Sequence, residues 1–264
     1  MQICANKQMP MELFLTPNWI SRFPHLRVGQ TTRHGGVSLA PYSSLNLGKS
    51  TDDNKDNVKE NRRRFCYALG FAPDQLAWSH QVHGTEVRIV ESPGDSEGYD
   101  ALITRTPGIV LVVSVADCTP ILVYDALNGA MAAIHAGWKG TAGKLVQKTL
   151  ETMAQTWGTR GEDCWAMVGV CIGPEAFEVG TEVAEKFEDV YKKWDENRGK
   201  FTVDLKKANL AQLLAFGIPE AQIDVSPHCT VTHNRDYFSH RAEKGITGRM
   251  LGFIGQKVAL EGEL

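Results

Sequence analysis

The stretch Gly108-Ile-Val-Leu-Val-Val-Ser-Val-Ala-Asp-Cys-Thr-Pro-Ile-Leu-Val-Tyr124 decides the fold class of this chain. It holds two apolar, β-branched runs, residues 108–116 and 120–124, with Asp117 and Cys118 between them. Short apolar runs without polar alternation are typical of strands that are buried on both faces. The stretch therefore predicts two central strands, with Asp117 and Cys118 at the point where the first strand ends.

Further strands and helices alternate on both sides of this stretch. Residues 131–135 and 166–172 have the same apolar character, and residues 86–90 alternate as a half-buried strand does. The spacing of apolar residues predicts helices at residues 53–68, 139–157, 179–193 and 205–216. Interleaved strands and helices predict an α/β or α+β fold with mixed sheets. Because no repeat or long linker interrupts the chain, we expect one compact unit over residues 1–264, with residues 1–10 as a loose N-terminal extension.

The bulk composition argues against several classes of protein. The formal net charge is −3, and charges of both signs are spread along the chain, so a nucleic-acid surface is not expected. No apolar stretch reaches the ~18 residues of a membrane span, and the amino terminus lacks the pattern of a secretory signal. We therefore expect a cytoplasmic protein without a membrane partner. The six cysteines form no CxxC pair, so any role for them must come from their neighbours.

Three side chains of types that can bind metals lie near the ends of predicted strands. Cys118 follows one strand, His135 ends another, and His83 precedes the strand at residues 86–90. Sheets of this class place their sites at strand ends. Two imidazoles and one thiolate would leave a fourth coordination position open, as in catalytic zinc sites, where the ion lowers the pKa of bound water. Spacing alone does not show that the three converge, and a packed cysteine and core histidines are the ordinary alternative.

Several familiar enzyme signatures are missing from the chain. No histidine is followed two positions later by glutamate, so the H-x-E motif of zinc nucleoside deaminases is absent along with its CxxC partner. The sequence also contains neither a GxxxxGK[ST] loop nor a GxGxxG motif. These absences disfavour nucleoside triphosphate and dinucleotide enzymes, and any deaminase chemistry would need a different site.

A set of short segments, in order over nearly the whole chain, carries a family resemblance. They are Thr31-Thr-Arg-His-Gly-Gly-Val-Ser38, Ser44-Leu-Asn-Leu-Gly48, Gln81-Val-His-Gly84, Ala116-Asp-Cys-Thr-Pro120, Ala133-Ile-His-Ala-Gly-Trp-Lys-Gly140, Gly169-Val-Cys-Ile-Gly-Pro174, Phe177-Glu-Val-Gly180 and Phe238-Ser-His-Arg241. In these segments the chain resembles the bacterial YfiH family. Its members are described as multicopper polyphenol oxidase or laccase-domain proteins and as purine nucleoside phosphorylases.

The resemblance implies a fold, a metal site and an activity. It implies a single catalytic domain with layered α/β/β/α architecture, shared with a cytotoxic-factor deamidase fold. Its metal ligands map onto His83, Cys118 and His135, with zinc as the expected ion and copper as the other possibility. The implied reactions are phosphorolysis of adenosine, inosine and methylthioadenosine and deamination of adenosine. The expected partners are thus a purine nucleoside and phosphate, and we expect a monomer or a small homo-oligomer.

Other residues of the matching segments are candidates for binding and proton transfer. Arg33 beside Gly35 and Gly36, and Lys139 between Gly137 and Gly140, could hold a phosphate, because glycines let backbone amides approach an anion. Asp117 and Glu178 are candidates for handling protons, although each could equally cap or pair. We expect substrate contacts from Arg33, Asn46, Lys139 and Arg241. His80 is expected next to the ligands or on the surface, and binding or surface roles are open for His34, His228, His233 and His240.

Three alternatives belong to other classes. A copper oxidoreductase acting on phenols fits the older family description, but multicopper oxidation needs more clustered histidines than this chain offers. A metal-free hydrolase could use Cys118 as nucleophile and His135 as base. A binding or scaffold protein without catalytic turnover is the third.

Overall fold

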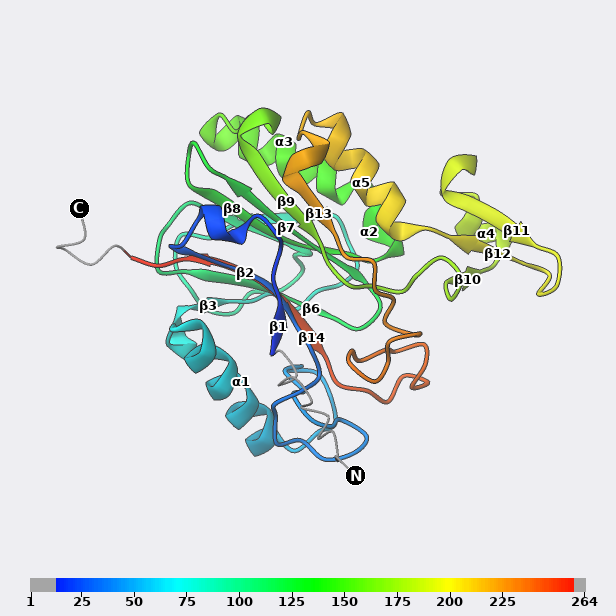
Figure 1. Cartoon of the computed structure of the whole chain (residues 1–264), viewed down its shortest axis with the longest axis horizontal. Coiled ribbons are helices and arrows are strands. Elements are labelled where there is room, and N and C mark those ends of the chain that lie inside the picture. The colour runs from blue at the N-terminus through cyan, green and yellow to red at the C-terminus, as the bar shows by residue number, and fades with distance from the viewer. Residues whose placement is uncertain (1–12, 259–264) are drawn as a thin grey trace, which may run out of the picture.

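The computed structural model describes residues 13–258, and Figure 1 shows their arrangement in layers. The expected extension at residues 1–10 lies outside this part. One sheet has the order β1 (Phe14–Leu15), β2 (Leu26–Thr31), β14 (Met250–Gln256), β6 (Val110–Val115) and β3 (Leu76–Ala77). The second has the order β13 (Ile223–Val225), β9 (Cys164–Val168), β7 (Thr119–Asp125), β8 (Ala130–Ala136), β5 (Ala101–Thr104) and β4 (Val87–Ile89).

Helices cover the outer faces of these two sheets. Helix α1 (Lys55–Leu69) lies against the first sheet, and α3 (Leu145–Trp157) and α5 (Leu205–Ala215) lie against the second (Figure 1). Both sheets are mixed, because β3 runs parallel to β6, β4 to β5 and β13 to β9, while the other pairs are antiparallel. The α/β/β/α architecture with mixed sheets is therefore confirmed.

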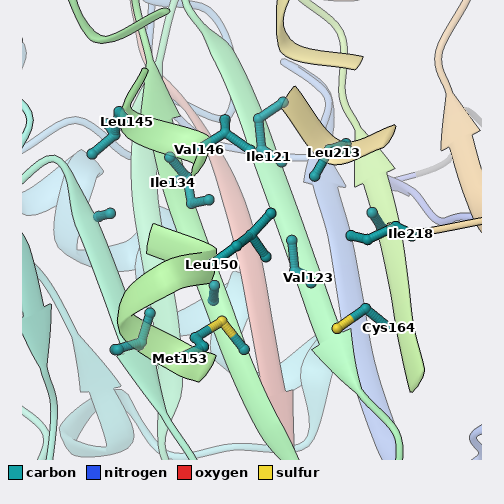
Figure 2. Close-up of a cluster of buried hydrophobic side chains, with 14 of the residues drawn as sticks. Ile121, Val123, Ile134, Leu145, Val146, Leu150, Met153, Cys164, Leu213 and Ile218 are labelled. Atoms are coloured by element: carbon teal, nitrogen blue, oxygen red, sulfur yellow. The ribbon is translucent and has the colours of Figure 1, made fainter. Parts of the chain in front are cut away.

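Each boundary between layers holds its own apolar cluster, because the inner strands of the two main sheets bury both faces. Between the second sheet and its helices, Ile121 and Ile134 pack against Leu150 and Leu213 (Figure 2). The space between the two sheets is filled by Leu111, Leu122, Met131, Ile254 and their neighbours. The cluster under α1 includes Phe65, Leu69, Val112 and Phe253.

Two of the predicted helices differ from the structure. The helix expected at residues 139–157 is divided into α2 (Trp138–Ala142) and α3, because Lys144 between them has a left-handed backbone with φ of 56°. The helix expected at residues 179–193 is wrong. That segment begins with β10 (Glu178–Val179), forms the four-residue α4 (Thr181–Ala184) and then enters β11 (Lys192–Asp195).

Strand pairing explains the second error. Both β10 and β11 pair antiparallel with β12 (Lys200–Val203), forming a small third sheet beside the main layers. Val179 and Phe187 are buried there, so they supply apolar positions that resemble a helical period in the sequence. Tertiary pairing has overridden a local preference. The helices expected at residues 53–68 and 205–216 and the strands at residues 108–116, 120–124 and 131–135 are confirmed within a few residues, whereas the strand expected at 166–172 ends at Val168. None of the helices in residues 13–258 is long and apolar enough to cross a membrane.

Candidate metal centre

The two sheets bring His83, Cys118 and His135 together, and their ligand atoms all lie within 4.8 Å of one another. Cys118 lies in the link from β6 to β7, and His135 is near the end of β8. Because β7 and β8 pair with Pro120 opposite His135, the hairpin itself places the thiol beside the imidazole. His83 comes from the loop before β4, and its ring centroid is 4.9 Å from that of His135. The predicted convergence is therefore present in the structure.

Gly137 is required for the close approach of these side chains. A Cβ atom at this position would lie 3.0 Å from the Sγ of Cys118 and 3.1 Å from the Cδ2 of His83. Both neighbours are candidate ligands, so neither could move aside without losing its place. The glycine before α2 thus lets the chain leave β8 directly past the ligands.

Asp100, directly before β5, holds two of the three ligands in place. Its Oδ1 lies 2.8 Å from the Nδ1 of His135, which leaves Nε2 as the ring nitrogen available to an ion. The same carboxylate accepts backbone N–H bonds from Val82 (3.2 Å), His83 (3.0 Å) and Gly84 (2.7 Å). Carboxylates that orient metal-bound histidines in this way are a recurrent part of metal sites. Asp100 is buried and connects the His83 loop to β8.

The charges of the site favour a thiolate. Burial raises the pKa of Cys118, but attraction and hydrogen bonding from His135 and His83 outweigh it and lower that pKa to about 6. Burial lowers the pKa of His135, whereas Cys118 and Asp100 raise it to about 9. Burial raises the pKa of Asp100, and hydrogen bonds from His135 and from the backbone of Gly84 bring it below its ordinary value. The thiolate is the form that binds metals.

Two residues of the site have left-handed backbones, with φ of 58° at His83 and 87° at Asp117. Residues with a Cβ atom disfavour this region, and strained backbones persist where neighbours hold them. His83 is held by Asp100. The carboxylate of Asp117 accepts hydrogen bonds from Thr230 Oγ1 (2.5 Å) and from the backbone N–H of Arg241 (2.7 Å). The turn that presents Cys118 is therefore fixed from both sides.

The three candidate ligands lie in the wall of a cavity of about 810 Å³. This volume is within the ~300–1,000 Å³ range of small-molecule sites. Of the other residues singled out in the sequence, Asp117, Arg241, His80 and His240 line the cavity. Its wall also contains the aromatic side chains of Trp78 and Phe177 and the cations Lys49 and Arg249. The residues singled out in the sequence therefore form part of the cavity wall, and most of its other residues were missed.

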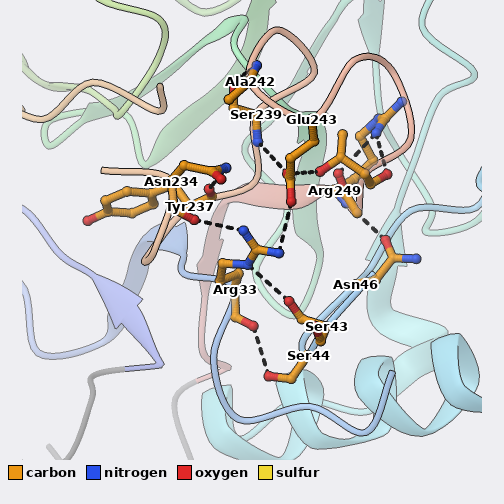
Figure 3. A network of polar contacts seen from close by, with 12 residues as sticks. Arg33, Ser43, Ser44, Asn46, Asn234, Tyr237, Ser239, Ala242, Glu243 and Arg249 are labelled. Carbon is orange, nitrogen blue, oxygen red and sulfur yellow. Dashed lines mark hydrogen bonds and ion pairs between the residues drawn. The ribbon is translucent and has the colours of Figure 1, made fainter. Parts of the chain in front are cut away.

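Arg33 does not line this cavity and is part of a hydrogen-bond network instead (Figure 3). Its Nε donates to Ser43 O (2.9 Å), its Nη1 to Asn234 O (2.7 Å), and its Nη2 pairs with Glu243 (3.1 Å). The guanidinium also stacks on Phe238, with 4.4 Å from Cζ to the ring centroid. All three nitrogens have protein acceptors, so in this structure Arg33 joins two loops of the fold, and the expected phosphate contact stays a prediction.

Asn46, Lys139 and Glu178 also lie away from the cavity wall. Asn46 is fully buried, and its side chain bonds Thr51, Asp53 and the backbone of Gly48 and Arg249. Lys139 is exposed in α2. Glu178 lines a second cavity and forms an ion pair of 3.1 Å with Arg198. The expected substrate contacts of Asn46 and Lys139 and the expected proton transfer by Glu178 stay predictions, with none of the three in the lining of this cavity.

The remaining histidines have other neighbours. His34 lies 2.9 Å from Asp236, and the rings of His228 and His233 pack against each other at 4.7 Å. None of these three histidines lines the cavity that contains the candidate metal ligands.

Asp100, Arg249 and Phe177 were not recognised from the sequence. Asp100 is a single carboxylate at the start of a strand, which carries no spacing signal. Phe177 begins a matching segment, and Arg249 directly precedes an apolar strand. These positions in the sequence were the only signal that either residue could lie at a site.

The donor set fits a metal ion. Imidazole nitrogen and thiolate are the ligands that zinc and copper prefer, and the orientation of His135 by Asp100 matches the second layer of contacts around such ions. Within residues 13–258 this is the one group of three or more ligand side chains so close together. A structural zinc site normally closes with four protein ligands, whereas this one offers three beside a cavity.

Comparison with known proteins places the chain in a family. Residues 27–257 match the family described as multi-copper polyphenol oxidoreductase laccase, and the chain belongs to it. The likeness to YfiH proteins is confirmed by relatives of that name. The chain is 38% identical over 249 residues to purine nucleoside phosphorylase YfiH of Escherichia coli, covering 92% of this chain and 99% of that protein.

Two further comparisons agree in sequence and structure. A purine nucleoside phosphorylase of Deinococcus radiodurans is 44% identical over 238 residues, which cover 89% of this chain and 91% of that protein. The crystal structure of YlmD from Geobacillus stearothermophilus superposes with a TM-score of 0.88 at 32% identity, covering 95% of this chain and 98% of YlmD. The fold and the family are thus shared with proteins named for nucleoside cleavage.

Proposed function

We propose that this chain is a zinc-dependent purine nucleoside phosphorylase that cleaves adenosine, inosine and S-methyl-5′-thioadenosine and also deaminates adenosine. The observation that carries the proposal is the convergence of His83, Cys118 and His135 in the wall of a cavity sized for a small molecule. The names of the relatives support the reaction class. The region matched by the family is proposed to act as one catalytic domain.

Zinc is the proposed ion, with copper as the other ion suited to these ligands. When bound, zinc supplies Lewis acidity and lowers the pKa of a coordinated water. The protein's own contribution is to fix the ligands: Asp100 sets the ring of His135 and the loop of His83, and Gly137 leaves room for the thiol. A fixed ligand set needs little rearrangement when the ion binds.

Aromatic and polar residues of the cavity are proposed to orient the nucleoside. Phe177 offers a ring face on which a purine can stack. Arg241 acts through Phe177, because its Nη atoms donate to the carbonyls of Ala176 (3.0 Å) and Glu178 (3.1 Å) on either side of that ring. Asp117 ties the Cys118 turn to Arg241. We therefore propose Arg241 and Asp117 as positioning residues.

Product analysis tests the proposed reaction. Zinc-loaded protein is incubated with adenosine, with and without inorganic phosphate, and the products are separated by chromatography. We expect adenine and ribose-1-phosphate only with phosphate, and inosine in both samples. Equal amounts of adenine without phosphate would indicate a hydrolase, and absence of adenine from both samples would contradict the proposal.

A cysteine hydrolase is the second candidate, favoured by the order Cys118, His135 and Asp100. The imidazole lies between the thiol and a carboxylate that bonds its Nδ1, which is the arrangement of a nucleophile, a base and an orienting group. The two candidates differ in their response to metal. A hydrolase of this kind would work after chelation and would be inhibited by zinc, whereas the phosphorylase would lose turnover on chelation.

A further inference from the structure

Phosphorolysis brings a phosphate anion into the active site, and the cavity wall contains a half-buried arginine, Arg249. Arg249 directly precedes β14, where Met250 pairs with Val115. It therefore lies beside the end of β6, from which Asp117 and Cys118 follow. Arg249 is half-buried and lines the same cavity as the candidate metal ligands. Arg33 and Lys139, the cations expected from the sequence, are outside that wall.

The guanidinium of Arg249 has donors to spare. Its Nη1 donates to Thr247 O (2.8 Å) and Gly248 O (3.0 Å), which fixes the plane of the group. Within residues 13–258, Nε and Nη2 have no hydrogen-bond acceptor and no carboxylate forms an ion pair with them. Burial lowers the pKa of Arg249, and attraction to Cys118, Asp117 and Glu243 offsets only part of that effect.

The other Lys and Arg side chains of the cavity wall are engaged differently. Lys49 pairs with Asp95 and lies over Trp78, with 4.7 Å from Nζ to the ring centroid. Arg241 uses both Nη atoms on backbone carbonyls. Among the described residues of this wall, Arg249 is therefore the arginine whose whole Nε and Nη2 edge has no protein acceptor.

The segment Ser44-Leu-Asn-Leu-Gly48 is shaped around Arg249. Asn46 Oδ1 accepts the backbone N–H of Arg249 at 2.9 Å (Figure 3). Leu47 N donates to Arg249 O at 3.0 Å. At Gly48, a Cβ atom would lie 2.7 Å from the Cγ of Arg249, so a larger residue would displace the stem of the arginine. Asn46 thus fixes the backbone of Arg249 as a positioning residue, and Gly48 leaves room for the stem of the side chain.

We propose that Arg249 is the anion-binding residue of the cavity and that its Nε and Nη2 edge holds the attacking phosphate. The inference rests on the proposed function. A guanidinium edge with two free N–H donors matches two oxygens of a phosphate. In the reaction, a phosphate oxygen bonds to the anomeric carbon as the glycosidic C–N bond breaks. The electron pair of that bond stays on the purine nitrogen, and the proton of hydrogen phosphate ends on the purine.

Steady-state kinetics of Arg249→Gln and Arg249→Lys test the assignment. We expect Arg249→Gln to raise the KM for phosphate by roughly 10- to 100-fold, because hydrogen bonds to a charged group are lost. Arg249→Lys keeps the charge without the fork, so its KM should fall between those of wild type and Arg249→Gln. The dissociation constant of inosine, measured in phosphate-free buffer, should stay within about twofold. An unchanged KM for phosphate in both variants would overturn the inference, as would an equal loss of inosine affinity.

Controls separate this inference from the proposed function. Arg105→Gln changes an exposed arginine outside the cavity. It should leave the KM for phosphate and the dissociation constant of inosine unchanged. Zinc content and circular dichroism report whether each variant is folded. If wild-type protein shows no phosphorolysis, the proposed function fails, and calorimetric titration with inorganic phosphate still tests the anion site. Binding by wild type and its loss in Arg249→Gln would support the site, whereas equal binding or no binding by wild type would refute it.

Discussion

The candidate metal centre around Cys118 and the hydrogen-bond network around Arg33 are both polar regions that contain segments matching the family, yet their side chains have different partners. In the Arg33 network every guanidinium nitrogen has a protein acceptor. At the metal centre, the ligand atoms of three side chains face one another and a cavity. A matching segment therefore locates a residue in the fold, but only its remaining hydrogen-bonding capacity indicates whether it can meet a ligand.

The largest effect is expected from removing a candidate ligand. His83→Ala, Cys118→Ala and His135→Ala should each weaken zinc binding by more than ~100-fold, because two ligands rarely retain the ion. The fold should persist, since the three large apolar clusters between the layers contain none of these residues. Elemental analysis measures the zinc content, and the far-ultraviolet circular dichroism spectrum shows whether the fold persists. Full zinc content in any one variant would remove that residue from the ligand set.

A smaller loss is expected at Asp100, which touches the ligands without binding the ion. Asp100→Asn keeps the size of the side chain but removes the negative charge beside His135. We expect zinc affinity to fall by roughly 10- to 100-fold, as for other orienting carboxylates. Competition with a chromophoric chelator measures this affinity. Wild-type affinity in Asp100→Asn would show that the loop and β8 hold the ligands without this carboxylate.

Arg33→Ala should affect the stability of the fold without affecting the candidate metal centre, because it removes the centre of the hydrogen-bond network. The free energy of unfolding should fall by about 2–4 kcal/mol, since Glu243 and two carbonyls lose their partner. Zinc content and the KM for phosphate should not change in the folded protein. Urea unfolding provides the measurement, with Arg105→Ala as the exposed control. A raised KM for phosphate without loss of stability would return Arg33 to the binding site.

The smallest expected effect on the metal comes from cysteines outside the cavity. Cys66→Ser and Cys164→Ser should keep full zinc content, because both thiols are buried in the apolar layers. Burial raises the pKa of Cys66 to about 11, whereas the pKa of Cys118 is lowered to about 6. In chelated protein, iodoacetamide should therefore label Cys118 first. The rate at which iodoacetamide labels Cys118 should fall as the pH decreases through about 6, because the thiolate is then protonated.

Peptide mass spectrometry gives the rate of labelling at each cysteine. Zinc should protect Cys118 by occupying its thiolate. Labelling of Cys66 at the same rate as Cys118, or labelling of Cys118 that zinc does not slow, would contradict the ligand assignment.

The sequence was informative where chemistry and strand ends coincide. His83, Cys118 and His135 could be selected because imidazoles and a thiolate stood beside predicted strands and in matching segments. Asp100 could not be selected, since its role depends on the pairing that brings β8 alongside the His83 loop. Burial and pairing that depend on distant segments leave little trace in local spacing.

The same reason accounts for the unexpected partners of the cations and for the error in the third sheet. Glycines beside Arg33 suggested an anion site, but Glu243, distant in sequence, takes up its Nη2. Conversely, the free edge of Arg249 follows from carbonyls that bind only Nη1. The helix expected at residues 179–193 failed because β12, which follows it in the chain, recruits both of its ends into a sheet.

The most direct test is whether the His83, Cys118 and His135 site must hold zinc for nucleoside cleavage. Protein stripped by a chelator is reloaded with zinc in copper-free buffer, and adenine release from adenosine is measured with phosphate present. We predict that stripped protein is inactive, that zinc restores the full rate, and that phenol oxidation is negligible. The site assignment would be contradicted if stripped protein worked as well as the zinc form, or if only copper restored turnover.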